Sequence, residues 1–287
     1  MRSSFLFVSG VLGLVALSTA CSVSTTDNSI TFKTQPEFVD PNQPAKESSK
    51  DWAGEEIVIK NAGVNPMLGT GGVTVNFDAT ATKITAKADF VGRADTEADA
   101  KLSIADAIAT FKIDEASGRV TIECGNGGKH GSSSAAASGC KRITITLPAG
   151  SETKAHKLTV STGMGDIKFS GAPTVSSLLV DNNGVGGVVD VSAIPVKGAN
   201  IVVTGEDDVV VRVPANFSAD SVVLTVALDT LATNEENLAR IITTDFPGME
   251  TNKPYGTVGT GAAVLNVQTK GDNAGGSLAD TVTIAKL

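Results

Sequence analysis

The chain has 287 residues, with 31 acidic against 23 basic side chains and a formal net charge of −8. Such an acidic surface repels nucleic acid and anionic lipid head groups, so the composition argues against a nucleic-acid-binding protein. Aromatic residues make up only 4% of the chain and glycines number 30, a composition typical of short β-strands joined by glycine turns.

The first twenty residues have the parts of a secretory signal. Arg2 precedes an apolar run from Phe5 to Leu17, and small residues follow up to Ala20. The apolar run is too short to span a bilayer, which takes about 20 residues. We therefore expect residues 1–20 to be a signal peptide that directs export.

The junction between Ala20 and Cys21 resembles the lipobox of bacterial lipoproteins, in which the cysteine sulfur receives a diacylglyceryl group and the freed amine is then acylated. Ser18 departs from that pattern, because a leucine is usual three residues before the cysteine. The resemblance implies lipidation at Cys21, palmitate included, and stable membrane anchoring by more than one acyl chain. By likeness to enterobacterial sorting, Ser22 favours the outer membrane, on its periplasmic or its outer face. The alternative is an ordinary signal peptide with Cys21 as an incidental thiol.

Residues 21–52 are polar and contain three prolines, so nothing there can build a core. We expect a flexible tether with a root-mean-square span of roughly 30 Å. The folded domain is then expected over residues 53–287.

Alternating apolar residues at 57–60 and 73–77 predict β-strands at the start of that domain. From Asp95 to Phe111 the pattern fits two structures. Thr96-Glu97-Ala98-Asp99 resembles a capping box, and Ile104, Ile108 and Phe111 fall at helical spacing. Leu102, Ile104 and Ile108, however, also share strand parity. We favour a short helix, with a strand as the alternative.

Cys124 and Cys140 are the cysteines that remain if Cys21 is lipidated, and an even pair in an exported protein indicates a disulfide. Two free thiols are the alternative, and a metal site is disfavoured because His130 alone is a poor third ligand. The apolar rows that flank the two cysteines have opposite parities. A simple hairpin would therefore turn one row outwards, so either a bulge lies near Cys140 or the two strands are not immediate partners.

The second half of the chain repeats a unit of strand, glycine turn and strand about every twenty residues. Repeats of this kind cannot bury their apolar faces alone and predict a stacked, β-solenoid-like fold with one or two short helices. An insertion at about 234–256 interrupts the array and starts with a predicted short helix at Asn234–Ile241. The four units are Leu158–Gly171, Leu179–Val191, Ile201–Val211 and the longer Val264–Ile284.

Leu147-Pro148-Ala149-Gly150, followed by a strand and then Ser161-Thr162-Gly163-Met164-Gly165-Asp166-Ile167, resembles the repeat of the bacterial putative-adhesin domain family. Members of that family show a Leu-Pro-Ala-Gly segment and repeated strand-turn-strand units, and many are exported or lipid-anchored. The resemblance covers residues 143–213 well and the last unit loosely. It implies a β-solenoid-like fold and a role in the cell envelope, and the family has no catalytic residues to transfer.

Residues suited to chemistry are few. His130 and His156 are the only histidines, and we expect both at the surface. Glu206-Asp207-Asp208 lies in a turn, where a solvated turn is favoured over a catalytic dyad or a calcium site. No sequence motif for a nucleophile elbow, a zinc helix or a phosphate loop occurs, and no cofactor or metal is expected.

These patterns indicate a non-catalytic adhesion or scaffolding module, anchored to the membrane and facing an envelope protein or a glycan, because repeated turns supply no unique set of acid, base and nucleophile. The alternative is an envelope hydrolase or glycan-active enzyme that uses Asp and Glu.

Overall fold

Alternation of apolar and polar residues produces most of the strands in the computed structural model. In β6 (Gly72–Asp78), Val73 and Val75 are buried while Thr74 and Asn76 face outwards, because successive side chains of a strand point to opposite faces. The structure describes residues 21–26, 29–34, 37–42, 44–63, 71–130, 137–182, 187–205, 207–214, 222–228, 242–244, 256–258, 263–269 and 282–287.

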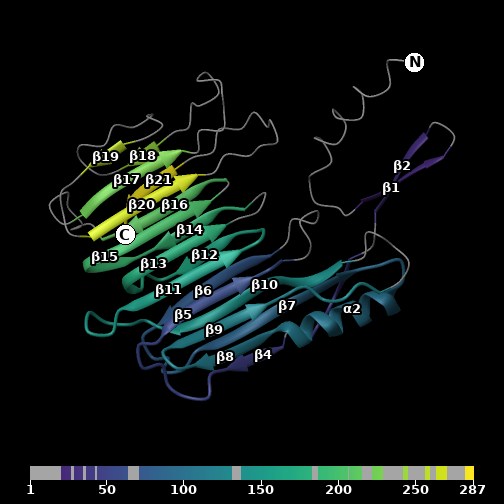
Figure 1. Ribbon diagram of the computed structural model, residues 1–287, viewed down its shortest axis with the longest axis horizontal. Coiled ribbons are helices and arrows are strands. Elements are labelled where there is room, and N and C mark those ends of the chain that lie inside the picture. Colours follow the sequence, from purple (N-terminus) through teal and green to yellow (C-terminus); the bar gives the residue numbers. More distant parts are fainter. Residues whose placement is uncertain are drawn as a thin grey trace, which may run out of the picture.

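Two sheets face each other across one core, and a separate two-stranded sheet pairs β1 (Cys21–Thr26) with β2 (Ser29–Thr34) (Figure 1). The ten-stranded sheet has, in spatial order, β18 (Ile242–Thr244), β21 (Val282–Lys286), β16 (Val209–Val213), β14 (Val189–Ser192), β12 (Ile167–Ser170), β6, β10 (Ala137–Pro148), β7 (Thr85–Arg93) and β3 (Glu37–Val39), with β4 (Ala45–Glu47) also paired to β7. The nine-stranded sheet has β19 (Gly256–Val258), β17 (Val222–Leu228), β20 (Ala263–Thr269), β15 (Ile194–Gly205), β13 (Thr174–Asn182), β11 (His156–Thr162), β5 (Glu56–Asn61), β9 (Arg119–Cys124) and β8 (Lys112–Ala116).

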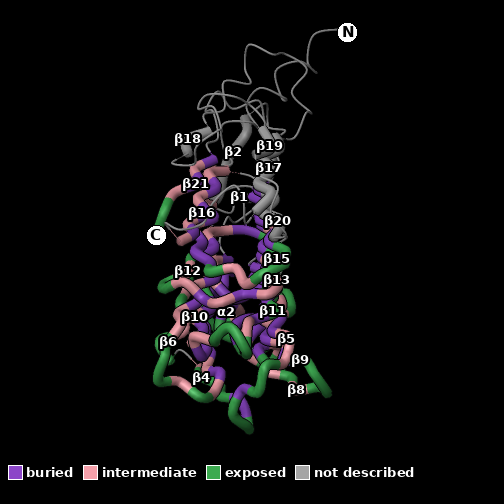
Figure 2. Tube along the Cα trace, turned by 90° about the vertical axis from the view of Figure 1, so that its left-hand side faces the viewer, coloured by how far each residue is buried: buried purple, intermediate pink, exposed green. Residues whose placement is uncertain are grey.

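The core lies between these two layers, where Figure 2 shows the buried residues gathered. Each predicted unit places its first strand in the nine-stranded sheet and its second in the ten-stranded sheet, and successive units pair in parallel. In-register pairing thus stacks equivalent side chains into rows along the core. One such row is Ile143, Val73, Ile167, Val189, Val209 and Val282, all of them at most 1% exposed.

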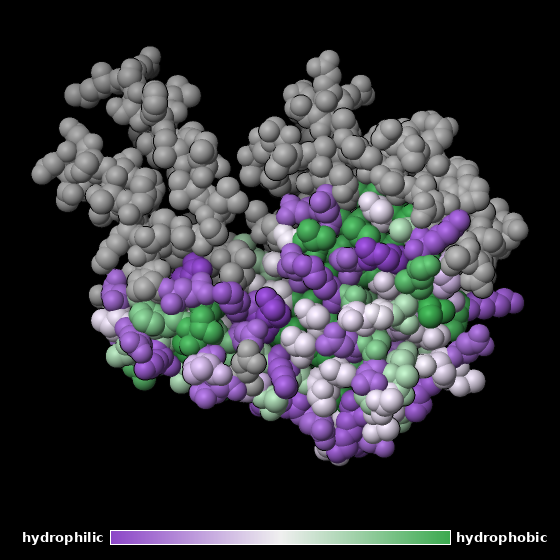
Figure 3. All heavy atoms as spheres, turned by 180° about the vertical axis from the view of Figure 1, so that it is seen from behind, coloured by the Kyte–Doolittle hydropathy of each residue, from purple (hydrophilic) through white to green (hydrophobic). Residues whose placement is uncertain are grey.

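The all-β class is therefore confirmed. Both sheets are mixed, because antiparallel pairs such as β7 with β10 and β8 with β9 adjoin the parallel ladders, and neither sheet closes on itself. Figure 3 shows the molecule from behind, where hydrophilic side chains and smaller hydrophobic patches share the described surface.

The ambiguous segment is a helix, α2 (Glu97–Thr110), and the favoured prediction is confirmed. Thr96 is its N-cap, with a side chain that accepts a hydrogen bond from the Asp99 backbone N–H at 3.1 Å. The helix packs on β7 and β10. Gly92 permits this approach, because a Cβ there would lie 2.8 Å from the Ala100 carbonyl oxygen and from Ile104.

The expected tether is wrong for its second half. β3 and β4 pair with β7, Ser48 is buried, and Trp52 is only 5% exposed. A polar, proline-containing stretch lacks the apolar surface to fold alone, but it can add strands to the edge of an existing sheet, where backbone hydrogen bonds stabilise it. The helix predicted at Asn234–Ile241 lies outside the described residues.

Within the described residues, no helix is long and apolar enough to cross a membrane.

Candidate functional site

The Leu-Pro-Ala-Gly segment forms one wall of a pocket at the end of the core that β4 and β5 flank. The pocket, here called the cap pocket, has a volume of about 340 Å³. The chain crosses from one sheet to the other beside it through Ser48–Glu55, here called the cap segment. The pocket is lined by Asp51, Trp52, Ala79, Ala81, Thr82, Pro148, Ala149, Gly150, Ser151 and Lys154.

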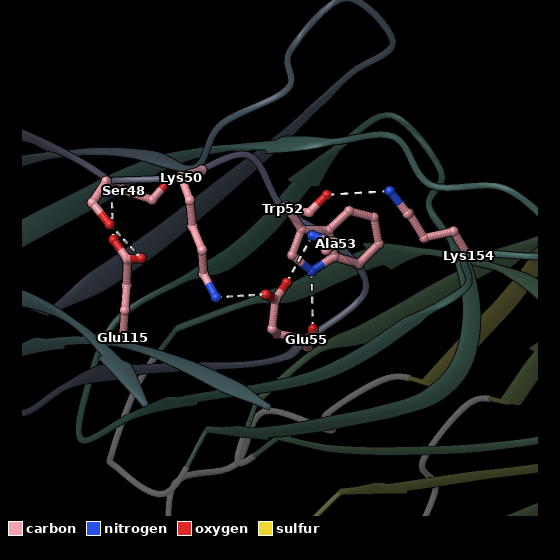
Figure 4. Close-up of polar contacts among 8 residues, drawn as sticks. Ser48, Lys50, Trp52, Ala53, Glu55, Glu115 and Lys154 are labelled. Carbon is pink, nitrogen blue, oxygen red and sulfur yellow. Dashed lines mark hydrogen bonds and ion pairs between the residues drawn. The ribbon is translucent and has the colours of Figure 1, made fainter. Parts of the chain in front are cut away.

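Polar contacts fix the cap segment in place (Figure 4). Ser49 donates from its backbone N–H and from its hydroxyl to the Glu115 carboxylate on β8, the latter at 2.8 Å. Lys50 forms an ion pair with Glu55 at 2.9 Å, and the Ala53 backbone N–H donates to the same carboxylate at 2.7 Å. The Lys50 contact above all, together with the Ala53 N–H, lowers the pKa of Glu55 to about 2 although partial burial opposes this.

Trp52 is the apolar anchor of the cap segment. Its ring stacks on the His156 ring with 4.2 Å between centroids, and its Nε1 donates to the Glu55 carbonyl at 2.9 Å. The ammonium group of Lys154 lies 5.6 Å from the Trp52 ring centroid and donates to the Trp52 carbonyl at 3.3 Å. The ring is thus covered by a cation and by a second ring, and this arrangement seals the end of the core.

His156 is fully buried, so the predicted surface position is wrong. Its Nε2 lies 2.8 Å from the Pro148 carbonyl oxygen, and because a carbonyl only accepts, Nε2 carries the proton. Its Nδ1 has no hydrogen-bond partner among the residues that the structure describes. Burial lowers the pKa of His156, although the Pro148 contact opposes the shift. Burial therefore favours the neutral ring, and its Nε2–H is donated to the Pro148 carbonyl oxygen.

Polar side chains line the cap pocket. Asp51 accepts a hydrogen bond from the Thr82 hydroxyl at 3.0 Å, and Ser151 contacts the Thr153 hydroxyl at 3.2 Å. Among the described residues that line the pocket, Ser151 is a serine whose hydroxyl contacts the Thr153 hydroxyl and the Lys154 backbone N–H, and neither a histidine nor a carboxylate. The pocket offers hydroxyl, ammonium and carboxylate groups to a polar ligand but no activated nucleophile.

The predicted disulfide joins Cys124 and Cys140, both fully buried, with 6.2 Å between their Cα atoms. Cys124 ends β9 in the nine-stranded sheet, whereas Cys140 lies in β10 of the ten-stranded sheet. The sequence left two explanations for the opposite parities of the apolar rows beside the two cysteines, and both apply. The two strands lie in different sheets and are not immediate partners, and β10 has a bulge between Cys140 and Arg142. The disulfide links the two layers through the core.

The remaining predicted residues are not brought together. His130 is half-exposed and its Nε2 contacts the Asp106 carboxylate at 2.8 Å. Asp207 is half-buried and accepts a hydrogen bond from the Gly187 backbone N–H in the preceding unit at 2.7 Å. Glu206 lies outside the described residues, and the described part of the chain has no cluster of three metal-ligating side chains.

Sequence reasoning missed the roles of Trp52 and His156. Parity could have found the second, because His156, Leu158 and Val160 alternate along β11 and all three are buried. It also missed a buried polar row at the corner between the sheets, formed by Asn61, Thr162 and Asn182 in register.

No family model matches the chain, and a search of curated proteins finds no match. Two solved structures are similar to it at low identity. A putative cell adhesion protein from Clostridium sporogenes is 12% identical with a TM-score of 0.45, covering 86% of this chain and 100% of its own. A putative adhesin from Bacteroides fragilis is 10% identical with a TM-score of 0.22, covering 86% of this chain and 98% of its own. A TM-score below 0.5 does not establish a shared fold, so the function of this chain has to be argued from its own residues.

Proposed function

We propose that this protein is a non-catalytic adhesion or scaffolding module of the bacterial cell envelope. The observation that carries the proposal is the broad outer face of the ten-stranded sheet. In-register pairing aligns Thr144, Thr74, Lys168 and Asp190 across four neighbouring strands, and none of these side chains is buried. Rows of hydroxyl and charged groups on a rigid sheet suit recognition of an extended polar partner, a glycan or an envelope protein.

The parallel ladders support a solenoid-like organisation of the repeats. Each unit adds one strand to each sheet, and buried polar side chains close the corners. Asn182, for example, donates to the Gly165 and Gly187 carbonyls at 3.2 and 3.1 Å. Such stacking lengthens the binding face with each unit while it buries a continuous core. Residues 37–55 and β7 then act as the capping end of the array, a part that stacked repeats need for solubility.

The lipid anchor at Cys21 is part of the proposal. It is supported by the apolar run and the Ala20-Cys21 junction, and it would place the module at the outer membrane. Growth with labelled palmitate and immunoprecipitation tests it, because label should enter the wild type and be absent from Cys21→Ala. Equal label in both proteins, or none in either, would remove the lipoprotein assignment.

A deletion strain tests the function itself. Its adhesion to surfaces and to other cells should fall, and the wild-type protein should restore it whereas Cys21→Ala should not. Full rescue by Cys21→Ala would contradict the anchored module. Turnover of a glycan or peptide substrate that is lost when a single Asp or Glu is replaced would instead favour the hydrolase alternative.

A further inference from the structure

A second pocket opens on the outer face of the ten-stranded sheet because one position in a row of side chains is a glycine. Gly72 on β6 lies in register with Arg142 on β10, and the next residue along β6, Val73, pairs with Ile167, which follows Asp166. Val73 is buried, so the Cβ that Gly72 lacks would point outwards, between Arg142 and Asp166. A Cβ there would meet only Asp166 backbone atoms, at 3.3 Å and beyond.

The resulting Gly72 pocket has a volume of about 390 Å³, within the range of small-ligand sites. Three of its side chains are cationic and one is a carboxylate. It is lined by Gly71, Gly72, Thr74, Lys141, Arg142, Gly165, Asp166 and Lys168.

Arg142 is the distinctive group. Its side chain is exposed, and among the described residues its guanidinium forms neither an ion pair nor a hydrogen bond, although Asp89 on β7 lies in register with it on the side away from Gly72. Lys141, in contrast, pairs with Glu37 at 2.7 Å. A guanidinium group presents donors in a fork that matches carboxylate and phosphate oxygens.

The carboxylate in the pocket is already engaged. Asp166 accepts a hydrogen bond from the Val188 backbone N–H at 3.0 Å and pairs with Lys168 at 2.5 Å. Partial burial tends to raise the pKa of Asp166, but the Lys168 and Val188 contacts and the nearby charge of Arg142 lower it overall. Asp166 thus stays ionised and holds Lys168 at the pocket, while Arg142 makes no direct ion pair or hydrogen bond within the described part of the chain.

We propose that the Gly72 pocket binds a single anionic group, a carboxylate or a phosphate, carried by a sugar. The net charge of −8 repels a polyanion at long range, whereas contact with Arg142 acts at short range, so the combination selects a sparsely charged ligand. This inference rests on the proposed function and specifies the chemical class of the partner that the binding module would recognise.

Calorimetric titration of the purified domain tests the site without reference to adhesion. The ligands are inorganic phosphate, glucuronate and, as a neutral comparison, glucose. The wild type should bind at least one of the two anions and bind glucose no more than weakly. Binding of phosphate alone or of glucuronate alone supports the site and identifies which anionic group it takes.

Two variants change the pocket in different ways, and a third is the matched control. Arg142→Gln removes the free guanidinium and should weaken anion binding about tenfold or more. Gly72→Thr keeps every charge but fills the gap, and it should weaken binding similarly. Lys157→Gln removes an exposed cation from β11 in the other sheet and should bind like the wild type.

Circular dichroism of each variant checks that it is folded. Unchanged anion binding in both folded pocket variants, equal weakening in Lys157→Gln, or no binding of either anion by the wild type would overturn the proposal. Loss of adhesion rescue with anion binding intact would instead count against the proposed function alone.

Discussion

Replacing Trp52 with alanine should destabilise the domain by about 3–5 kcal/mol, the range seen for large buried aromatic residues. Trp52 is 5% exposed, and a buried tryptophan removes roughly 150–250 Å² from water. At about 25 cal/mol per Å² this corresponds to about 4–6 kcal/mol, an upper bound because the unfolded chain already buries part of its apolar surface. Loss of the stack on His156 is included in that figure.

Urea unfolding followed by far-ultraviolet circular dichroism measures the effect. Tryptophan fluorescence cannot serve for the variant, because Trp52 is the only tryptophan in the chain. Trp52→Phe keeps an aromatic ring against His156 and loses the hydrogen bond to the Glu55 carbonyl, so it should cost about 1–2 kcal/mol. Val39→Ala, at a side chain 55% exposed on β3, is the control and should change stability by less than about 0.5 kcal/mol. A loss at Trp52→Ala no larger than at Val39→Ala would refute the role of Trp52 as the apolar anchor of the cap segment.

Three further predictions concern the core. Cys140→Ser should lower stability by about 3 kcal/mol, the value for a closed loop of about 15 residues. Alkylation of the wild type unfolded in denaturant without reductant should modify neither Cys124 nor Cys140, and added alkyl groups on both would show that the disulfide is absent. Ile167→Ala should cost about 2–5 kcal/mol in urea unfolding, whereas its exposed neighbour Lys168→Ala should cost less than about 1 kcal/mol, and equal losses would mean that the inward register is wrong. The pKa of His156 is lowered from 6.5 in the folded state, so the unfolded chain binds a proton first as the pH falls below about 6.5. The free energy of unfolding should therefore decrease from pH 7 towards pH 5 more steeply in the wild type than in His156→Gln. Parallel pH profiles of the two proteins would contradict the burial of a neutral ring.

The sequence predicts the strands of the repeats well because their signal is local. Period-two alternation at Ile167 and Val189 directly encodes which side faces the core, and both residues are fully buried in register. The helix at Glu97–Thr110 was likewise indicated by its cap. The disulfide followed from cysteine count and export, although its role as a link between layers depends on topology, which no local pattern contains.

The cap segment and the Gly72 pocket could not be predicted from local sequence patterns, because both depend on contacts between segments that are distant in the sequence. Trp52 is buried against His156, which lies far along the chain, and a lone tryptophan after a polar stretch has no periodicity to reveal it. The pocket at Gly72 exists because β10 and the residue before β12 place Arg142 and Asp166 on either side of a glycine. Parallel pairing between strands that are distant in sequence is what a single sequence encodes least.

The pairing of β1 with β2 changes how far the proposed lipid would stand from the folded domain. Cys21 pairs with Thr34, so the acylated residue would be held about 5 Å from a residue only three positions before Glu37, where β3 begins. A chain spans at most about 3.6 Å per residue, so Cys21 and the edge of the ten-stranded sheet would be separated by roughly 16 Å at most. This maximum separation is about half of the root-mean-square span of roughly 30 Å that is expected for a free tether. In a lipidated form, β3 and β7 would lie near the head groups and the later repeats would extend away from that edge. The lipid would thus attach the protein to the membrane at its capped end.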